Sequence, residues 1–243
     1  MKNKFTHLHV HTQYSLLDGS IRIPDLIKKT KDLGMDSIAI TDHGSMFGVV
    51  DFYKEAKKQG IKPILGSEVY VAFENYLDKD NKEKKNYHLV LLAENNTGYK
   101  NLMKISSLAY VNGFYYRPRI DHNVLEEYSA GIIALSACLG GEVQNHILDN
   151  NIDKARSLAE KYKQIFGEKN FYLELQDHSL DEQKRVNREL IKMSKELDIP
   201  LIASNDVHYL NKEDAGFHDV LLCVQTGKTV DDEDRMSFAS NEF

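Results

Sequence analysis

Alternating apolar and polar side chains fill the stretch Phe5-Thr6-His7-Leu8-His9-Val10-His11, and this stretch decides how the rest of the fold is interpreted. A period of two predicts a β-strand, in which every second side chain lies on the same face. His9 and His11 therefore share a face at the end of the strand, where both imidazoles can reach one ion. A helix is expected next, from Ile23 to Leu33, with a proline near its start and a glycine after its end.

The same alternation of short apolar strands and longer amphipathic helices continues along the chain. We expect further strands at 37–41, 62–71, 87–92, 131–135, 171–175 and 201–204, and further helices at 49–59, 97–110, 151–166 and 180–197. A charge-dense stretch at 77–86 predicts a solvated loop. Seven short strands separated by helices predict an α/β protein with a parallel, closed or nearly closed sheet. In such barrels the chemistry lies at the C-terminal ends of the strands.

The composition is that of an ordinary folded protein, and it limits the choice of function. The 243 residues fit one α/β barrel or two small domains, and a hydrophobic content of 42% argues against a disordered chain. A formal net charge of -6 argues against binding nucleic acid through the whole surface, although it leaves room for a local cationic site. The sequence has no apolar run long enough for a membrane span and no signal-peptide core, and its two cysteines cannot make a disulfide framework. We therefore expect a cytoplasmic protein with no membrane partner.

Histidine, acidic and thiol side chains lie at or near the C-terminal ends of six of the seven predicted strands. His88 fits this pattern imperfectly, because it comes early in its strand. The candidate ligands for a metal site are His9, His11, Asp18, His43, Glu68, His88, Cys138, Asp206 and His208. Imidazole, carboxylate and thiolate ligands together suit zinc, with manganese or iron as alternatives. One histidine at a strand end is usually structural, but a set that converges from six strands is hard to explain by packing alone.

With these residues the chain resembles the PHP (polymerase and histidinol phosphatase) family, and most of all the N-terminal PHP domain of bacterial replicative DNA polymerase III alpha subunits. The resemblance runs essentially from end to end. It rests on the segments FTHLHVHTQYSLLDG (5–19), ITDHG (40–44), KPILGSEVY (62–70), YHLVLLA (87–93), SACLGGE (136–142) and NDVHY (205–209).

The resemblance implies a distorted seven-stranded (β/α)7 barrel that holds up to three divalent metal ions at the C-terminal ends of its strands. It also implies that all nine candidate ligands bind these ions. The activity that it implies is that of a metal-dependent phosphoesterase, and more narrowly a 3′–5′ exonuclease that proofreads. His7 stands where many family members have aspartate, and we expect it to orient a ligand.

The resemblance further implies that residues 1–243 are a single PHP domain from a much longer polymerase subunit, with about the last 25 residues leading towards the next domain. The full-length subunit would be a DNA-directed DNA polymerase, whereas the chain alone would not polymerise DNA. The expected partners are a DNA 3′ end, the remainder of the alpha subunit and other replisome subunits, among them a separate proofreading exonuclease.

Some residues are candidates for steps beyond metal binding. Asp206 or His208 could protonate the leaving group. Arg117 and Arg119 follow two tyrosines and could hold the phosphates of a DNA end, or could belong to a loop that docks on another domain. His178 follows the sixth predicted strand and could line the pocket, or could be a structural hydrogen-bonding residue.

Two other functions are compatible with the same residues. The first is a scaffold whose metal ions are structural, stabilising the polymerase and binding a separate proofreading subunit. Loss of stability on chelation without nuclease activity would favour that function. The second is a free-standing phosphatase of the histidinol-phosphate type, which the segments around Asp18 and Cys138 disfavour.

Overall fold

The computed structural model describes residues 5–79, 86–238 and 240. Within them the chain forms a mixed α/β structure whose strands are β1 (Ser37–Ile40), β2 (Lys62–Ala72), β3 (Asn86–Ala93), β4 (Arg119–Ile120), β5 (Ile132–Leu135), β6 (Phe171–Leu175) and β7 (Leu201–Ala203). The helices are α1 (Ile23–Asp32), α2 (Val49–Gln59), α3 (Asn96–Val111), α4 (His122–Glu127), α5 (Glu142–Leu148), α6 (Ile152–Phe166), α7 (Asp181–Leu197) and α8 (Ala215–Thr226).

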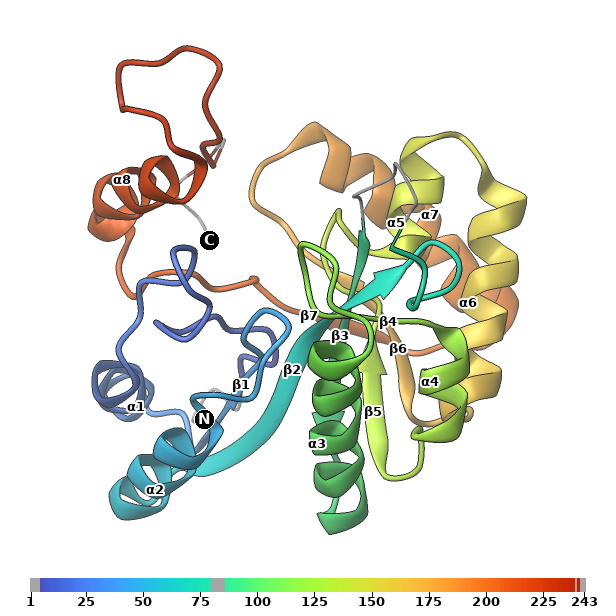
Figure 1. Ribbon diagram of the computed structural model, residues 1–243, viewed down its shortest axis with the longest axis horizontal. Helices are drawn as coiled ribbons and strands as arrows, with labels where there is room; N and C mark the ends of the chain where they lie inside the picture. Colours follow the sequence, from blue (N-terminus) through green and yellow to red (C-terminus); the bar gives the residue numbers. More distant parts are fainter. Residues whose placement is uncertain (1–4, 80–85, 239, 241–243) are drawn as a thin grey trace.

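The strands form a curled sheet in the order β1-β2-β3-β5-β6-β7, and β4 pairs with β2 off this path. The pairs β1–β2, β5–β6 and β6–β7 are parallel. Helices α1 and α2 lie beside β1, α3 runs along the middle of the sheet, and α4 to α7 gather on the side of β5 and β6 (Figure 1). The predicted α/β class and distorted barrel are therefore confirmed.

One predicted strand direction is wrong. We expected 87–92 to run parallel with the others, but β3 runs antiparallel to both of its neighbours, β2 and β5. The reason lies in the connection. A parallel crossover usually needs a helix, whereas antiparallel strands can be joined directly, and the sequence between β2 and β3 is the predicted loop at 77–86. Residues 80–85 of that loop lie outside the described residues. Because β3 is reversed, its N-terminal end reaches the rim where the parallel strands end.

The first predicted strand, Phe5–His11, is present as an extended segment rather than as a regular strand. It makes backbone hydrogen bonds to two different neighbours. On one side the amide of Ala39 donates to the carbonyl of His7 at 2.9 Å, and on the other the amide of His11 donates to the carbonyl of Val207 at 2.7 Å. Val10 forms an isolated parallel bridge with Val207. Pairing is shared between two edges, so no continuous ladder forms, yet the segment still carries its histidines into the gap between β1 and the residues after β7.

The other predicted helices and strands are present to within one residue at each end. Helix ends follow ordinary rules. For example, α2 is capped by Gly60, which adopts a left-handed conformation with φ 77° that glycine accepts at no steric cost.

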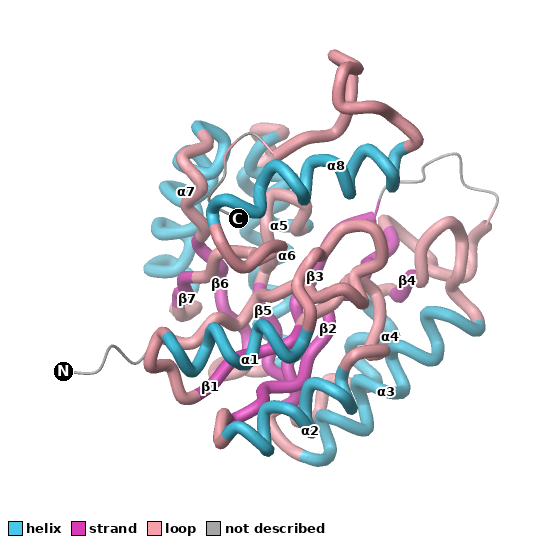
Figure 2. The backbone as a smooth tube through the Cα atoms, turned by 90° about the vertical axis from the view of Figure 1, so that its left-hand side faces the viewer, coloured by secondary structure: helices cyan, strands magenta, loops and turns pink. Residues whose placement is uncertain are grey.

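The elements that the sequence pattern missed are β4 and the helices α4, α5 and α8. In two views α8 lies outside the sheet (Figures 1 and 2). No helix in the described part of the chain is both long and apolar enough to cross a membrane.

A small apolar cluster fills the inside of the curled sheet below the predicted ligands. It contains Ala39, Val90, Leu92, Leu135 and Ala137, all of them buried. Val90 on β3 lies directly opposite Glu68 on β2, so the two side chains share the inner face. The apolar cluster therefore packs beneath the Glu68 carboxylate and excludes water from that side of it.

Candidate metal centre

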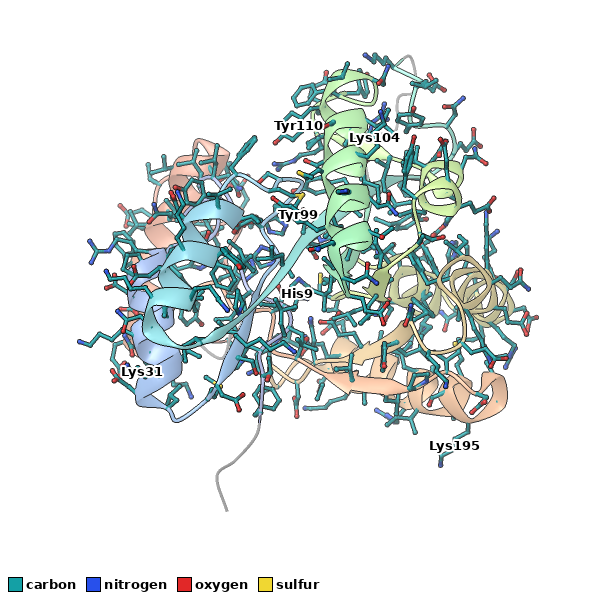
Figure 3. The ribbon with its side chains drawn as sticks, turned by 90° about the horizontal axis from the view of Figure 1, so that it is seen from below. His9, Lys31, Tyr99, Lys104, Tyr110 and Lys195 are labelled. Carbon is teal, nitrogen blue, oxygen red and sulfur yellow. The ribbon has the colours of Figure 1, made fainter. Side chains whose placement is uncertain are left out.

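The predicted ligands meet at one rim of the curled sheet. His43 follows β1, Cys138 follows β5, and His208 follows β7. His88 belongs to the same rim because β3 is reversed, which resolves its imperfect fit to the sequence pattern. Figure 3 shows His9 near the middle of the molecule, between the N-terminal elements and the rest of the sheet.

One group of ligand atoms comes from the extended segment and from the residues after β7. Nε2 of His9 and Nε2 of His11 each lie 3.1 Å from Oδ1 of Asp206. All three side chains are buried. Two imidazole nitrogens that converge with a carboxylate oxygen in a buried place are a typical arrangement around a divalent ion.

Glu68 connects this group to the next. Its Oε1 atom lies 3.3 Å from Nε2 of His9 and 3.0 Å from Nδ1 of His88. Its Oε2 atom lies 3.7 Å from Nε2 of His11 and 2.5 Å from Nδ1 of His43. One carboxylate with imidazoles on both of its oxygens has the position of a bridging ligand.

Asp18 and His208 complete the rim on the side of β1. Oδ2 of Asp18 lies 2.9 Å from Nε2 of His43, and Oδ1 lies 3.9 Å from Nε2 of His208. The ring of His11 stacks against both of these histidines, with centroid distances of 3.9 Å to His43 and 4.3 Å to His208. The positive charges of His43 and His208 disfavour protonation of His11, which leaves its ring free to bind a metal.

Cys138 lies at the edge of the same cluster. Its Sγ atom is 3.7 Å from Nδ1 of His88 and 4.0 Å from Oε1 of Glu68. Burial raises the pKa of the Cys138 thiol well above its ordinary value, and the carboxylates of Asp206 and Glu68 raise it further. A thiol in these surroundings becomes a thiolate only when a cation lies beside it, as in a metal site.

The buried polar atoms of the cluster fit divalent metal ions. Six of them make no well-aligned hydrogen bond within the described part of the chain, and each lies 2.5–3.9 Å from an imidazole nitrogen or carboxylate oxygen of the cluster: His9 Nε2, His11 Nε2, Asp18 Oδ1, His43 Nδ1, Glu68 Oε2 and Asp206 Oδ1. Buried nitrogen and oxygen atoms that face one another without hydrogen-bond alignment have the arrangement of ligands around a cation. Three groups of residues can each hold an ion, because the ligand atoms within a group all lie within 4.8 Å of one another. The groups are His11/His43/His208, His9/His11/Asp206 and His43/Glu68/His88.

The other ring nitrogen of three of these histidines is held by an oxygen atom. Nδ1 of His9 lies 2.8 Å from Oε1 of Glu174, Nδ1 of His11 lies 3.0 Å from Oγ of Ser15, and Nδ1 of His208 lies 2.7 Å from the carbonyl of Asp206. A proton on Nδ1 that is donated to each oxygen leaves the Nε2 lone pair facing the cluster. Such partners fix the tautomer and the ring direction of metal-binding histidines.

The orienting residue Glu174 was missed by the sequence interpretation. It lies on β6 and is fully buried, and the amide of Ala137 donates to its Oε2 atom at 3.0 Å. The signal was a lone carboxylate in an otherwise apolar strand, Phe171–Leu175. His7, which we expected to orient a ligand, instead packs edge-on against Phe5 and lines a different cavity, next to α1.

The imidazoles of the cluster differ in their preferred charge. Burial alone would lower the pKa of His9, but the carboxylates of Asp206, Glu174 and Glu68 hold it well above its ordinary value. Burial, together with the neighbouring His43 and His208, lowers the pKa of His11 to about 3. His11 is therefore unprotonated at neutral pH, as a metal ligand has to be.

The carboxylates of the cluster are ionised at neutral pH. Burial alone would raise the pKa of Glu68, Asp206 and Asp18, but the surrounding imidazoles hold all three pKa values below their ordinary range. Three buried negative charges close together are costly unless cations offset them. Protonated imidazoles offset these charges, because the carboxylates hold the pKa values of His9 and His43 well above the ordinary value, and divalent ions bound here would offset them in the same way.

The structure corrects two of the predicted substrate contacts. Arg119 is buried, and its guanidinium donates to the backbone carbonyls of Gly113, Tyr76 and Asp78 at 3.2, 3.1 and 2.6 Å. It therefore braces its own loop instead of facing a phosphate. His178 is also buried: its Nε2 lies 2.7 Å from the carbonyl of Asn205, and its Nδ1 lies 2.7 Å from the amide nitrogen of Gln183. It is the structural residue that the sequence left as an alternative.

Arg117 is exposed and lies near the cluster, with its guanidinium carbon 5.5 Å from the centroid of the Tyr70 ring.

A further histidine also supports the centre. His218 on α8 is buried, and its Nε2 lies 2.8 Å from the carbonyl of Asp18. The helix that the sequence pattern missed therefore holds the loop of a predicted ligand.

A comparison with protein families matches residues 7–178 to the PHP domain. The chain belongs to the PHP domain family. The sequence resemblance to that family is thereby confirmed, and it places the histidine and carboxylate rim in a family named for polymerases and phosphatases.

Over its whole length the chain is similar to bacterial DNA polymerase III alpha subunits. The subunit of Borreliella burgdorferi is 51% identical over 100% of this chain and 21% of that protein. The subunits of Aquifex aeolicus and Thermus aquaticus are 46% and 45% identical over 100% of this chain, and over 21% and 20% of their own lengths. The chain thus spans about a fifth of the length of these relatives.

Solved structures share the fold of this PHP domain at low sequence identity. A Bifidobacterium adolescentis protein described as a metal-dependent phosphoesterase matches with a TM-score of 0.53 and 16% identity, over 85% of this chain and 88% of that one. A two-domain Bacteroides vulgatus protein described as containing a PHP-like metal-dependent phosphoesterase has a TM-score of 0.54 and 14% identity, over 92% of this chain and 55% of that one. These likenesses bear on the fold alone.

Proposed function

We propose that residues 1–243 are the PHP domain of a replicative DNA polymerase III alpha subunit and that this domain hydrolyses phosphodiesters with the help of divalent metal ions. The observation that carries the proposal is the convergence of buried imidazole and carboxylate ligand atoms in three overlapping groups at one rim of the sheet, among them six atoms that make no well-aligned hydrogen bond in the described residues. Full-length similarity to alpha subunits supports the link to replication. It also disfavours a free-standing histidinol-phosphate-type phosphatase.

The site would hold up to three divalent ions. The three ligand groups overlap through His11 and His43, so ions bound there would be close neighbours. Imidazole nitrogens, carboxylate oxygens and the Cys138 sulfur together favour zinc, with manganese or iron as alternatives.

When bound, such ions supply an activated water and offset the negative charge of a phosphate. The protein's own residues do the rest. Asp18, Glu68 and Asp206 bring the negative charges that retain the ions. For protonation of the leaving group we favour His208 over Asp206. Both residues line the cavity, but Oδ1 of Asp206 lies 3.1 Å from two histidine nitrogens, whereas the Asp18 carboxylate oxygen that faces Nε2 of His208 is 3.9 Å away.

The cavity above the ligands can admit part of a substrate. It has a volume of about 330 Å³, and Asp18, His43, His88, Asp206 and His208 are among its lining residues. We propose a DNA 3′ end as the substrate and 3′–5′ proofreading hydrolysis as the reaction. Polymerisation would belong to the full-length subunit, and the remainder of that subunit, with other replisome proteins, would be the partners.

The test is release of 3′ nucleotides from a primed DNA by the purified chain, with zinc or manganese and with a chelator. The active-site variant is His9→Ala/His11→Ala, and the matched control is His146→Ala, because His146 is a half-buried histidine on α5 outside the ligand set. We expect release that depends on metal, is lost in the double variant and persists in the control.

The other function left open by the sequence gives a different result. If the metal ions only stabilise a scaffold, chelation lowers the melting temperature while no nucleotide is released under any condition. That outcome would reject the phosphoesterase and leave a structural metal centre.

A further inference from the structure

A second cavity opens beside the metal centre and has aromatic walls. It has a volume of about 220 Å³, and its lining includes Phe47, Tyr110, Phe114 and Tyr116. Two predicted metal ligands, Asp18 and His43, belong to the same lining. A molecule in this cavity would therefore contact the ligand cluster directly.

The aromatic side chains of the wall remain open to solvent. Phe47, Tyr110, Phe114 and Tyr116 are 56%, 37%, 47% and 60% exposed, respectively. Their rings follow one another, since the centroids of Phe47 and Tyr110 are 5.5 Å apart and those of Tyr110 and Phe114 are 6.1 Å apart. Figure 3 shows Tyr110 on the side of α3 that faces the N-terminal elements. Exposed aromatic rings that gather next to a polar site indicate a binding surface.

The backbone of Tyr116 also adopts a conformation that is unfavourable for a residue with a side chain. Its φ is 59°, in the left-handed region, which costs roughly 1–2 kcal/mol for a residue with a side chain. The amide of Tyr115 donates to the carbonyl of Arg117 at 3.0 Å and closes the loop tightly around Tyr116. A strained backbone that presents a mostly exposed ring is typical of a functional site rather than of a core.

A positive charge lies between the aromatic wall and the metal centre. The exposed Arg117 belongs to the cavity lining, and its guanidinium stacks over Tyr70. The Tyr70 ring in turn lies parallel to the His43 ring, with centroids 6.1 Å apart. The order from the wall inwards is therefore aromatic rings, an arginine and metal ligands.

We propose that this aromatic cavity is a subsite for one unpaired nucleobase of single-stranded DNA, with Arg117 holding the phosphate between that base and the metal centre. This inference rests on the proposed function, because it assigns the substrate class of the same site. Bases stack on aromatic side chains, and arginine pairs with phosphate. The cavity is smaller than the roughly 300–1,000 Å³ of a typical ligand pocket, so it suits one flat ring system.

The subsite would discriminate between single-stranded and paired DNA ends. A base within a duplex is already stacked and paired, so it can enter an aromatic cavity only after the end opens. A terminal mismatch lowers the free energy needed to open the end. Selection of frayed or mismatched 3′ ends would then follow from the cavity itself. A protein partner is the less favoured occupant, because a protein surface seated there would cover Asp18 and His43.

Binding, rather than hydrolysis, tests the inference. The probe is a single-stranded oligonucleotide with 2-aminopurine as its 3′ base and phosphorothioate linkages at that end, titrated into the zinc-loaded chain. A matched duplex is the second probe. The variants are Phe47→Ala/Phe114→Ala and Arg117→Gln, and the control is Tyr53→Ala, because Tyr53 is an exposed aromatic residue on α2 outside the cavity lining.

We expect quenching of 2-aminopurine fluorescence by the wild-type chain and tighter binding of the single strand than of the duplex. Removal of the two phenylalanine rings should weaken single-strand binding by roughly 5- to 100-fold, the range found when stacking side chains are removed. Tyr53→Ala should bind like wild type.

Equal affinity of the double variant and wild type, or equal affinity for single strand and duplex, would overturn the inference. If the same variants instead lose association with the rest of the polymerase, the wall is a protein interface and the inference is also wrong. A chain that binds single strands through this wall yet hydrolyses no DNA would reject the proposed function and leave the subsite standing.

Discussion

Replacement of Glu174 by glutamine tests whether the buried carboxylate sets the tautomer of His9. The two side chains have the same shape, so packing is kept while a charge and an acceptor are lost. In the structure Oε1 of Glu174 accepts from Nδ1 of His9 at 2.8 Å and from the amide of Gln176 at 3.1 Å, and it also contacts Oγ of Ser204. Its Oε2 accepts from the backbone amide of Ala137 at 3.0 Å. Both oxygens are therefore acceptors for N–H groups.

A glutamine side chain has only one acceptor oxygen, so it can accept a hydrogen bond either from His9 or from Ala137, but not from both. If its NH₂ group faces Ala137, two donors oppose each other, and an unsatisfied buried donor costs about 1–3 kcal/mol. If its NH₂ group faces His9, Nδ1 has to accept, so the ring proton moves to Nε2 and the metal-binding lone pair is lost. Loss of such an orienting partner typically weakens metal binding 10- to 100-fold. Glu174→Gln should therefore lower either the stability without metal or the zinc affinity.

Two measurements decide the outcome. Zinc affinity is measured by competition with a chelating dye, and the melting temperature is measured in excess chelator, where about 1–3 kcal/mol corresponds to about 2–12 °C for a chain of this size. The matched control is Glu168→Gln, an exposed carboxylate. If Glu174→Gln matches wild type in both zinc affinity and melting temperature, the orienting role is refuted.

Three further predictions address acid stability, a backbone position and metal preference. Burial would raise the pKa of Glu142, but the hydrogen bond from His122 at 2.9 Å holds this pKa below its ordinary value. The ionised form of Glu142 therefore stabilises the fold above about pH 4.3, and this contribution to stability is lost as the pH falls. Glu142→Gln should thus be less stable than wild type in urea at pH 7 and closer to it at pH 3, both in chelator; a gap that does not change with pH would contradict this. Gly44→Ala should lower the unfolding free energy in urea by about 2–4 kcal/mol, because Gly44 has φ 59° and an added Cβ would lie 2.7 Å from Cγ of Pro118; an unchanged midpoint would speak against it. Cys138→Ser should weaken zinc binding more than manganese binding in competitive titrations, since only the softer ion gains from a thiolate, and an equal loss for both metals would exclude Cys138 as a ligand.

Much of the fold and of the candidate site was predictable because the relevant signals are local. Strand and helix bounds follow from apolar periodicity and from residues such as Pro24 and Gly60, which act within a few positions of the chain. The ligands also came from a local signal, since His9 and His11, or Asp206 and His208, are two residues apart on extended backbone. A rule about strand ends then predicted that they meet.

Several of the errors arise because the partners are far apart in sequence. The orienting bond from Glu174 to His9 joins residues 165 positions apart, and the bond from His218 to Asp18 joins residues 200 positions apart. Arg119 looked like a phosphate contact because an arginine beside tyrosines has the right chemistry. Its burial against three carbonyls is visible only once the loop has folded.

The sequence by itself determined the α/β class, the helices and the residue types that can hold divalent ions, because each of these depends on neighbours along the chain. Only the tertiary structure decided that β3 is reversed, that Glu174 holds His9 and that four aromatic rings form a wall beside the metal ligands. Strand direction, orienting partners and cavities depend on which distant surfaces pack together. That choice is made by burial and hydrogen bonding across the whole molecule, and no short window of sequence contains it.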